Sequence, residues 1–336
     1  MADVKFISVV PRVPDFDRYC RTATDVVRWS DSADLDGVLI FTGTGAVLDP
    51  FIAATAAAAS TARLVPLIAV NPVYQHPYTA ARMVSSIGLL YHRRVDLNLI
   101  TGTAVSDLAA VGDDTDHDGR YARLAEYVDI MMGLLGSPRP LTYQGQFYRV
   151  SRLQLSPALP SVLLPRLFVA GQSPAAQRVA ERAGAISIQM LMPGDCDARL
   201  TAGAIHVGIL ARPSDAEAIQ AAQARFPADP IGAKLVAATM SNTDSTWKQR
   251  LFETAASSID TQSGYWLGPF RSGQADGPYL VGEYAAIADR LARLARSGVS
   301  DFVIDTPATE VDFQHLAQVV QQTRSQLPAH PLRGER

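Results

Sequence analysis

Lysine and blocks of like charge are scarce in this chain. Only 3 of its 30 basic residues are lysines, and a net charge of −3 is spread over 336 residues without an acidic or basic segment. A surface without concentrated positive charge gives no electrostatic reason to bind nucleic acid or an anionic membrane. We therefore expect neither as a partner.

Cysteine is equally scarce, and long apolar runs are absent. Cys20 and Cys196 cannot build a disulfide framework and lack the spacing of metal ligands, which favours a reducing compartment. The hydrophobic run near the amino terminus is too short for a signal peptide, and no segment reaches the roughly 18 apolar residues that cross a bilayer. We expect a cytoplasmic protein without a membrane segment.

Three catalytic signatures are also missing. The first apolar run ends in Val-Pro-Arg-Val-Pro at residues 10–14 rather than in Gly-x-Gly-x-x-Gly, which disfavours a dinucleotide-binding Rossmann fold. No Gly-x-Ser-x-Gly elbow is present, which disfavours a serine hydrolase. The ends of the predicted strands offer at most one imidazole and one carboxylate, too few for a metal site. We therefore expect no metal.

What the chain does contain is a regular alternation of short apolar runs and helical patterns. The predicted strands cover residues 5–10, 37–41, 64–70, 95–100, 167–170, 185–190, 204–211 and 302–305. Between them, apolar residues recur at helical spacing, as in residues 17–33 and 120–135. Eight such units predict the α/β fold class, as a (β/α)8 TIM barrel. We expect residues 1–328 to form one domain, followed by a disordered tail at 329–336.

Two connections depart from the regular pattern. Only residues 191–203 separate the sixth and seventh predicted strands, so the sixth helix must be shortened. Between the seventh and eighth strands, residues 226–283 form a long insertion, and six of the residues 264–278 are Gly or Pro. A loop of this kind at a barrel mouth is commonly a lid, mobile without ligand, and we expect one here.

Polar and small residues follow the predicted strands, where a barrel builds its active site. They are Pro11, Arg12, Thr42, Gly43, Asn71, Asn98, Thr101, Gly171, Gln172, Ser173, Met190, His206 and Asp305. Amides and hydroxyls dominate this set, which suits a flavin, because the edge of a flavin ring needs both hydrogen-bond donors and acceptors. The helices that begin near His117 and after Ser173 can each offer free N–H groups to a phosphate.

Four short motifs resemble one known family when taken together. They are Asn98-Leu-Ile-Thr-Gly102, Asp116-His-Asp-Gly-Arg-Tyr121, Gly37-Val-Leu-Ile-Phe-Thr-Gly43 and Phe270-Arg271-Ser-Gly273. Their order and spacing resemble the bacterial luciferase-like flavin monooxygenases, in particular the alkanesulfonate monooxygenase-like branch. The resemblance implies reduced FMN as cofactor, O2 as co-substrate, a separate NAD(P)H flavin reductase as partner, and a homo-oligomer, either a dimer or a tetramer.

The resemblance also implies residue roles. Asn98 and Thr101 would lie along the flavin ring, and His117 and Tyr121 would lie near its phosphate. The further expected cofactor-binding residues are Thr42, Asn71, Gly171, Gln172 and Ser173, where Gln172 replaces the second glycine of the family's Gly-Gly-Ser turn. Arg271 matches the arginine of the family's lid and is expected to be catalytic. Arg12 and Met190 are expected to face the substrate.

Departures from the family concern the substrate end of the site. The branch's cysteine is replaced by residues 44–46, its seventh-strand Arg and His become His206 and Gly208, and its tyrosine after the last strand falls at Pro307. Because a fixed cation is lost and Gly208 leaves room, we expect a substrate other than a simple alkanesulfonate, such as a biosynthetic intermediate. His206 is the expected proton-transfer group, since an imidazole titrates near neutrality.

Plainer interpretations stay open at this point. Asn98 can be a satisfied core amide, His117 a helix-start residue, His206 a core histidine and Arg271 a solvated loop arginine. Two other functions are also compatible with the sequence. One is an F420-dependent oxidoreductase of the same superfamily, and the other is a flavin-binding protein that has lost its chemistry. The substrate itself cannot be named from the sequence.

Overall fold

Eight parallel strands close into a barrel in the computed structural model, which describes residues 4–102, 105–193, 203–239, 246–254, 259, 264–305 and 307–328. The barrel strands are β1 (Lys5–Val9), β2 (Gly37–Ile40), β3 (Val65–Val70), β4 (Asp96–Leu99), β7 (Leu167–Ala170), β8 (Ile186–Met190), β9 (Gly203–Arg212) and β12 (Val299–Asp305). Pairing of β8 with β9 completes the circle. The predicted (β/α)8 barrel is therefore confirmed, and each predicted strand overlaps an observed one.

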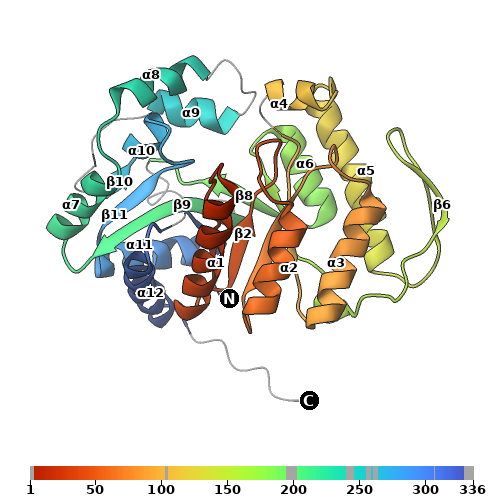
Figure 1. Cartoon of the computed structure of the whole chain (residues 1–336), viewed down its shortest axis with the longest axis horizontal. Coiled ribbons are helices and arrows are strands. Elements are labelled where there is room, and N and C mark those ends of the chain that lie inside the picture. The colour runs from red at the N-terminus through yellow and green to blue at the C-terminus, as the bar shows by residue number, and fades with distance from the viewer. Residues whose placement is uncertain are drawn as a thin grey trace.

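Helices cover the outside of this barrel (Figure 1). They are α1 (Phe16–Ser32), α2 (Pro50–Ser60), α3 (Pro77–Tyr91), α5 (His117–Leu135), α6 (Pro174–Ala183), α11 (Tyr284–Ser297) and α12 (Glu310–Ser325). Local sequence determines where several of them begin. Asp15 and Asp116, for example, each accept a hydrogen bond from a backbone N–H of the first turn, which satisfies a donor that the helix itself leaves unpaired.

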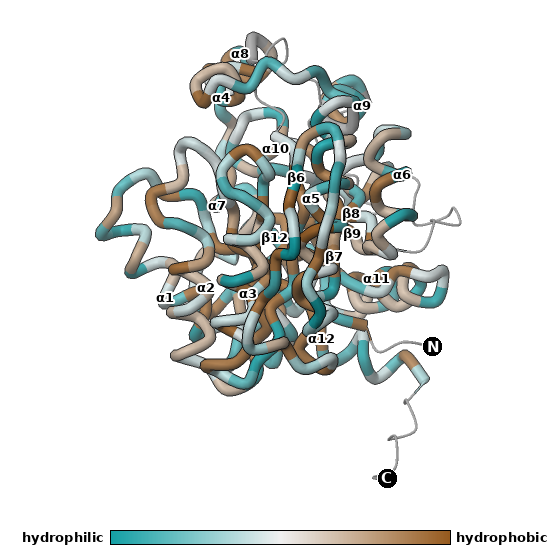
Figure 2. Tube along the Cα trace, turned by 90° about the vertical axis from the view of Figure 1, so that its right-hand side faces the viewer, coloured by the Kyte–Doolittle hydropathy of each residue, from teal (hydrophilic) through white to brown (hydrophobic). Residues whose placement is uncertain are grey.

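The core has two layers because successive strand residues point to opposite sides of the sheet. Phe6 packs outward in the cluster between strands and helices, whereas its neighbour Ile7 packs inward in the barrel interior with Leu67 and Phe168. Strands buried on both faces are apolar at nearly every position. Figure 2 accordingly shows the apolar residues concentrated along the central strands.

In the insertion between β9 and β12, the segment that we predicted as a lid loop carries short helical and strand elements, and its mobility stays a prediction. The insertion contains α7 (Asp215–Arg225), α8 (Pro230–Thr239), α9 (Thr246–Thr254), β10 (Tyr265–Trp266), α10 (Gly268–Arg271) and β11 (Tyr279–Glu283). The aromatic side chains of Trp266 and Phe270 are buried, with 7% and 5% of their surface exposed. β11 pairs in parallel with the second half of β9, beyond the part that pairs with β8. The sequence analysis missed this strand, because Gly and Pro residues just before it suggested a loop.

Other predictions have mixed outcomes. The polar stretch at residues 143–148, whose sequence is compatible with a small hairpin, lies in one, formed by β5 (Leu141–Gln144) and β6 (Arg149–Leu153), while the short helix α4 (Val105–Ala110) was not predicted. The predicted shortened sixth helix and the predicted tail lie at residues 194–202 and 329–336, outside the described residues. Within the described part of the chain, no helix combines the length and the apolar character needed to cross a membrane.

Candidate active site

A cavity of about 510 Å³ lies at the carboxyl ends of the barrel strands. Ten of the predicted site residues line it, namely Arg12, Thr42, Asn71, Asn98, Thr101, Tyr121, Gly171, Gln172, Met190 and His206. They come from seven different strands or the loops and helices that follow them, so only the closed barrel brings them together. Three predicted residues, His117, Ser173 and Arg271, are not part of the cavity wall.

One half of the cavity presents neutral amides and hydroxyls from the segments that follow β3 and β4. Asn71 and Thr101 are buried, and the Asn71 side-chain oxygen accepts a hydrogen bond from the backbone N–H of Val73 at 3.1 Å. Asn98 has 5% of its surface exposed, and its Oδ1 has no hydrogen-bond partner among the described residues. A buried acceptor left without a donor costs about 1–3 kcal/mol. Asn98 Oδ1 is therefore a place for an N–H group of a ligand.

At one edge of this neutral half, a close approach brings Tyr121 to the start of α6. A Cβ atom on Gly171 would lie 2.6 Å from the Tyr121 hydroxyl oxygen and 3.0 Å from the Ala176 Cβ. The first distance is shorter than real Cβ contacts and the second is tight, and L side chains rarely adopt the φ of +154° found at this position, so glycine is favoured here. As a result a buried phenol lies next to the first turn of α6, where free N–H groups favour an anion.

His117 and Ser173 support this edge from outside the cavity wall. The His117 ring lies 5.1 Å from the Tyr121 ring between centroids, and its Nδ1 lies 2.8 Å from an Asp118 carboxylate oxygen. Ser173 is the N-cap of α6, and its hydroxyl oxygen accepts a hydrogen bond from the Ala176 backbone N–H at 3.2 Å. Their proposed phosphate contacts stay predictions, because each has a structural task here.

His206 faces the cavity from β9 and is buried, with 6% of its surface exposed. Its Nε2 has no hydrogen-bond partner among the residues that the structure describes. Burial lowers the pKa of the imidazole below its ordinary 6.5, while the carboxylates of Asp305 and Asp276 oppose this shift. A neutral imidazole with an open nitrogen can accept a proton from a bound molecule.

The space beside Gly208 is occupied, contrary to our expectation. Gly208 lies in register with Tyr279 of β11 on one side and Asp305 of β12 on the other. A Cβ on Gly208 would lie 2.4 Å from atoms of the Tyr279 ring, so the ring crosses directly over the glycine. The Tyr279 hydroxyl then donates to Asp305 Oδ2 at 2.8 Å. Sequence analysis missed this tyrosine because it missed β11; the glycine inside a buried strand was the available signal.

Arg12 and Met190 meet the insertion at the cavity. The Arg12 guanidinium lies 4.2 Å above the centre of the Phe41 ring, and two of its nitrogens lie 3.4 Å from the Asp276 carboxylate. Met190 packs beneath the insertion, where a Cβ on Gly277 would lie 3.1 Å from its sulfur. Both residues therefore sit where a substrate would pass between barrel and insertion.

Arg271 lies elsewhere. It is at the end of α10, and its guanidinium carbon lies 5.7 Å from the centre of the Phe252 ring of α9. It packs within the insertion rather than against the cavity. Its predicted catalytic role stays a prediction, and this position requires the insertion to move before Arg271 can reach a bound molecule.

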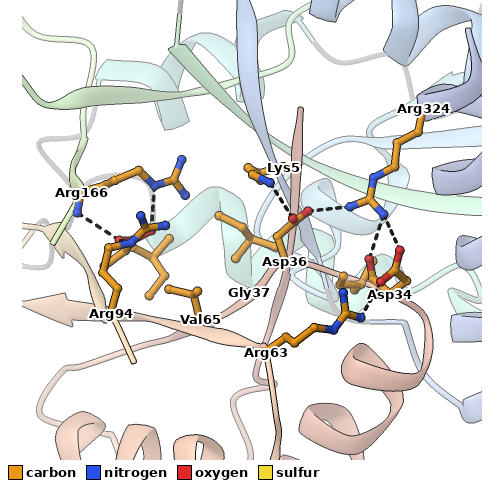
Figure 3. Close-up of a pocket in the computed structure, with 13 residues that line it drawn as sticks. Lys5, Asp34, Asp36, Gly37, Arg63, Val65, Arg94, Arg166 and Arg324 are labelled. Atoms are coloured by element: carbon orange, nitrogen blue, oxygen red, sulfur yellow. Dashed lines mark hydrogen bonds and ion pairs between the residues drawn. The ribbon is translucent and has the colours of Figure 1, made fainter. Parts of the chain in front are cut away.

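The opposite mouth of the barrel holds a second cavity, of about 450 Å³, with a charged lining (Figure 3). Arg166 pairs with Asp96 at 2.9 Å and with Asp301 at 2.8 Å, and both carboxylates are almost fully buried. The remaining ion pairs of this mouth are Arg94–Asp96, Lys5–Asp36, Arg63–Asp34, Arg324–Asp34 and Arg324–Asp36. Every cation of this lining therefore has a carboxylate partner, and this mouth is not a candidate active site.

Comparison with known proteins agrees with this geometry. The model of the luciferase-like monooxygenase family matches residues 17–301. The chain is 31% identical over 331 residues to BtrO of Niallia circulans, a monooxygenase named for a 4-(gamma-L-glutamylamino)butanoyl group on the BtrI acyl-carrier protein. The match covers 94% of this chain and 96% of that relative.

Solved structures share the fold at low sequence identity. The oxygenating component of 3,6-diketocamphane monooxygenase from the CAM plasmid of Pseudomonas putida, in complex with FMN, has a TM-score of 0.69 at 16% identity, covering 97% of this chain and 99% of that one. An F420-dependent secondary alcohol dehydrogenase has a TM-score of 0.68 at 14% identity, covering 96% of this chain and 99% of that one. The fold alone therefore does not separate the two cofactors. The family match over most of the sequence shows that the chain belongs to the luciferase-like monooxygenase family and is a flavin-dependent monooxygenase.

Proposed function

We propose that this protein is the oxygenase component of a two-component system that uses FMNH2 supplied by a separate NAD(P)H flavin reductase, with O2 as co-substrate. The observation that carries the proposal is the cavity with a buried acceptor, Asn98 Oδ1, that no described residue satisfies. A flavin ring offers N–H donors at its edge, so such an acceptor fits it. The proposal includes a cytoplasmic location, where reduced nicotinamide is available, and a homo-oligomeric state.

The neutral half of the cavity fits the flavin. Asn71, Asn98 and Thr101 would bind the ring, and Tyr121 with the first turn of α6 would bind the phosphate. Thr42 and Gln172 complete the wall on either side. Reduced FMN, when bound, supplies the electrons that activate O2. One oxygen atom then enters the substrate and the other leaves as water.

His206 is the proposed proton-transfer group of this reaction. Burial keeps its imidazole neutral in the free protein, so it can take a proton from the substrate and return it later in the cycle. The buried aromatic residues of the insertion, Trp266 and Phe270, help to keep water away from that end of the site.

The substrate is proposed to be a small organic acyl compound rather than a simple alkanesulfonate. BtrO is named for an acyl group carried by an acyl-carrier protein, and it aligns with nearly the whole of this chain. A carrier-bound acyl group is therefore the first substrate class to test, and γ-L-glutamyl-4-aminobutanoyl-pantetheine is a soluble member of it.

The test combines cofactor binding with isotope incorporation. We expect anaerobic titration to give tighter binding of FMNH2 than of F420H2, and Tyr121→Phe to weaken FMNH2 binding about 10-fold or more, because a hydrogen bond to a charged group is lost. With a flavin reductase, NADH and 18O2, one 18O atom should enter the pantetheine thioester. Preferential binding of F420H2 would overturn the cofactor assignment. Flavin binding without 18O incorporation into any acyl thioester would indicate a protein that has lost its chemistry.

A further inference from the structure

Charge divides the cavity into two halves. The half next to β3, β4 and β7 is lined mostly by neutral side chains such as Asn71, Asn98 and Gln172, and Asp107 of α4 is the carboxylate on that side. On the other side, Arg12 and Asp276 face the cavity together with His206. Arg12 is the one Arg or Lys in the described lining of this cavity. Only the second half sets a cation beside a carboxylate in the described lining, and a flavin ring does not need such a pair, so this charged half has a different task.

The ion pair in this half is loose. Arg12 has 63% of its side chain exposed and Asp276 has 33%, and both nitrogen–oxygen contacts measure 3.4 Å. Charge-assisted hydrogen bonds normally measure about 2.7–2.9 Å. An exposed ion pair of this kind contributes little to stability, so a ligand can replace it at small cost. Stacking on Phe41 holds the guanidinium in place even when the carboxylate partner leaves.

Carboxylates and cations meet at this end of the cavity. Asp276 and Asp305 act to raise the pKa of both His206 and Tyr279, and they are opposed by Arg12 at His206 and by Arg225 at Tyr279. Of these four charged groups, Arg12 and Asp276 are the two in the described lining of the cavity. Asp305 is already engaged by the Tyr279 hydroxyl. Within the charged half, Asp276 is therefore the carboxylate that a cationic ligand group can reach, and Arg12 is the group for an anionic one.

We propose that the charged half of the cavity is a substrate subsite for a zwitterionic end group, an ammonium and a carboxylate on one carbon atom, with Arg12 binding the carboxylate and Asp276 binding the ammonium. A γ-glutamyl group has such an end. Its carboxylate would take the place of Asp276 beside Arg12, and its ammonium would take the place of Arg12 beside Asp276. The inference deepens the proposed function and rests on it for the identification of this cavity as the substrate site.

Three amides of equal length test the subsite directly. γ-L-Glutamylpropylamide carries both charges, glutaric acid monopropylamide lacks the ammonium, and 4-aminobutanoic acid propylamide lacks the carboxylate. We expect calorimetric titration in the presence of FMN to show that the zwitterion binds about 10- to 100-fold more tightly than either analogue, because each analogue loses one charge-assisted contact.

Two variants assign the two charges. Arg12→Gln should weaken the zwitterion about 10- to 100-fold and leave 4-aminobutanoic acid propylamide unchanged, because that analogue has no carboxylate to lose. Asp276→Asn should also weaken the zwitterion about 10- to 100-fold, and it should leave glutaric acid monopropylamide unchanged, because that analogue has no ammonium to lose. The matched control is the pair Arg28 and Asp25 of α1, whose exposures of 64% and 40% resemble those of the cavity pair. Arg28→Gln and Asp25→Asn should change none of the three affinities.

Equal affinities for the three amides, no binding of the zwitterion, or identical losses in the cavity and control variants would each overturn the subsite. Isotope incorporation separates this outcome from failure of the proposed function. A protein that oxygenates an acyl thioester but binds the three amides equally keeps the function and loses the subsite. One that shows the expected affinities without incorporating 18O keeps the subsite and contradicts the function.

Discussion

The two mouths of the barrel differ in whether their buried polar groups have partners. At the amino ends of the strands, the buried carboxylates of Asp96 and Asp301 share one arginine, Arg166, and every lining cation is paired. At the carboxyl ends, Asn98 Oδ1 and His206 Nε2 are buried without partners among the described residues. At the first mouth the charged side chains pair with one another, and even Arg94 Nε, which lacks a hydrogen bond, lies 2.8 Å from an Asp96 oxygen. At the second mouth an uncharged acceptor and an imidazole nitrogen have no such partner and can bind a ligand.

This difference separates stability from function within one barrel. Ion pairs at the amino ends join β4 and β12 through Arg166, which directly precedes β7, and join β1 to Asp36, which directly precedes β2. Their loss should therefore destabilise the whole fold. Unsatisfied groups at the carboxyl ends already weaken the free protein, so their removal should affect binding and catalysis instead. Four substitutions examine this comparison.

The largest effect is expected for His206→Gln. The single-turnover rate should fall about 10²- to 10⁴-fold, and the limb of the pH profile that reports the imidazole should disappear. Because burial lowers the folded-state pKa below 6.5, the wild-type protein should lose stability as the pH falls below that value, and the variant should not. Rapid-quench rates and melting temperatures, both measured against pH, check this. A lower melting temperature with an unaltered pH profile would make His206 a core residue.

Arg166→Met should destabilise the fold by about 3–5 kcal/mol, because it leaves two buried carboxylates without their shared cation. Burial raises the pKa of Asp301 in the wild type, although Arg166 acts to lower it. Without Arg166, the pKa of Asp301 should rise further. A raised carboxyl pKa costs stability as the pH rises through it, so the deficit should shrink in acid. Denaturant unfolding between pH 4 and pH 8 measures this.

Arg28→Met is the control for that experiment, since Arg28 forms an exposed pair with Asp25 at 2.9 Å. It should change stability by less than about 0.5 kcal/mol at any of these pH values. FMN affinity of folded Arg166→Met should equal that of the wild type. A large loss of FMN affinity would mean that the two mouths are coupled and that the comparison is wrong.

Gly208→Ala should cost about 1–3 kcal/mol, because the new methyl group overlaps the Tyr279 ring. The same substitution should cost almost nothing in a Tyr279→Ala background, where the ring is absent. A double-mutant cycle by thermal unfolding measures this coupling. Additive effects would show that the ring does not depend on the glycine.

Among the four substitutions that examine the comparison, Asn98→Leu should have the smallest effect on stability, within about 1 kcal/mol, since it replaces a buried amide with an unsatisfied Oδ1 by an apolar side chain of similar size. FMN binding should nevertheless weaken about 10-fold. Fluorescence titration measures the FMN affinity, and denaturant unfolding measures the free energy of unfolding. Unchanged FMN affinity would remove Asn98 from the flavin site, and a stability loss above 2 kcal/mol would make it a satisfied core amide.

Much of the fold could be predicted because it depends on local patterns. Continuous apolar runs identify strands buried on both faces, and helical spacing with caps such as Asp15 and Asp116 identifies the helices. Residues directly after strands then had to share one mouth of the barrel, which is why ten of the thirteen predicted site residues line one cavity.

What the sequence by itself determined, then, is the eight-unit barrel and the set of residues at its carboxyl ends. Only the tertiary structure decided what stands beside those residues. No local pattern predicts where β11 pairs with β9. This pairing places the Tyr279 ring over Gly208, so that its hydroxyl reaches Asp305. Asp276 reaches Arg12 across more than 260 positions of the chain, and Arg271 packs on Phe252 away from the cavity. Pairing between distant segments depends on register and packing, which spacing along a chain does not encode.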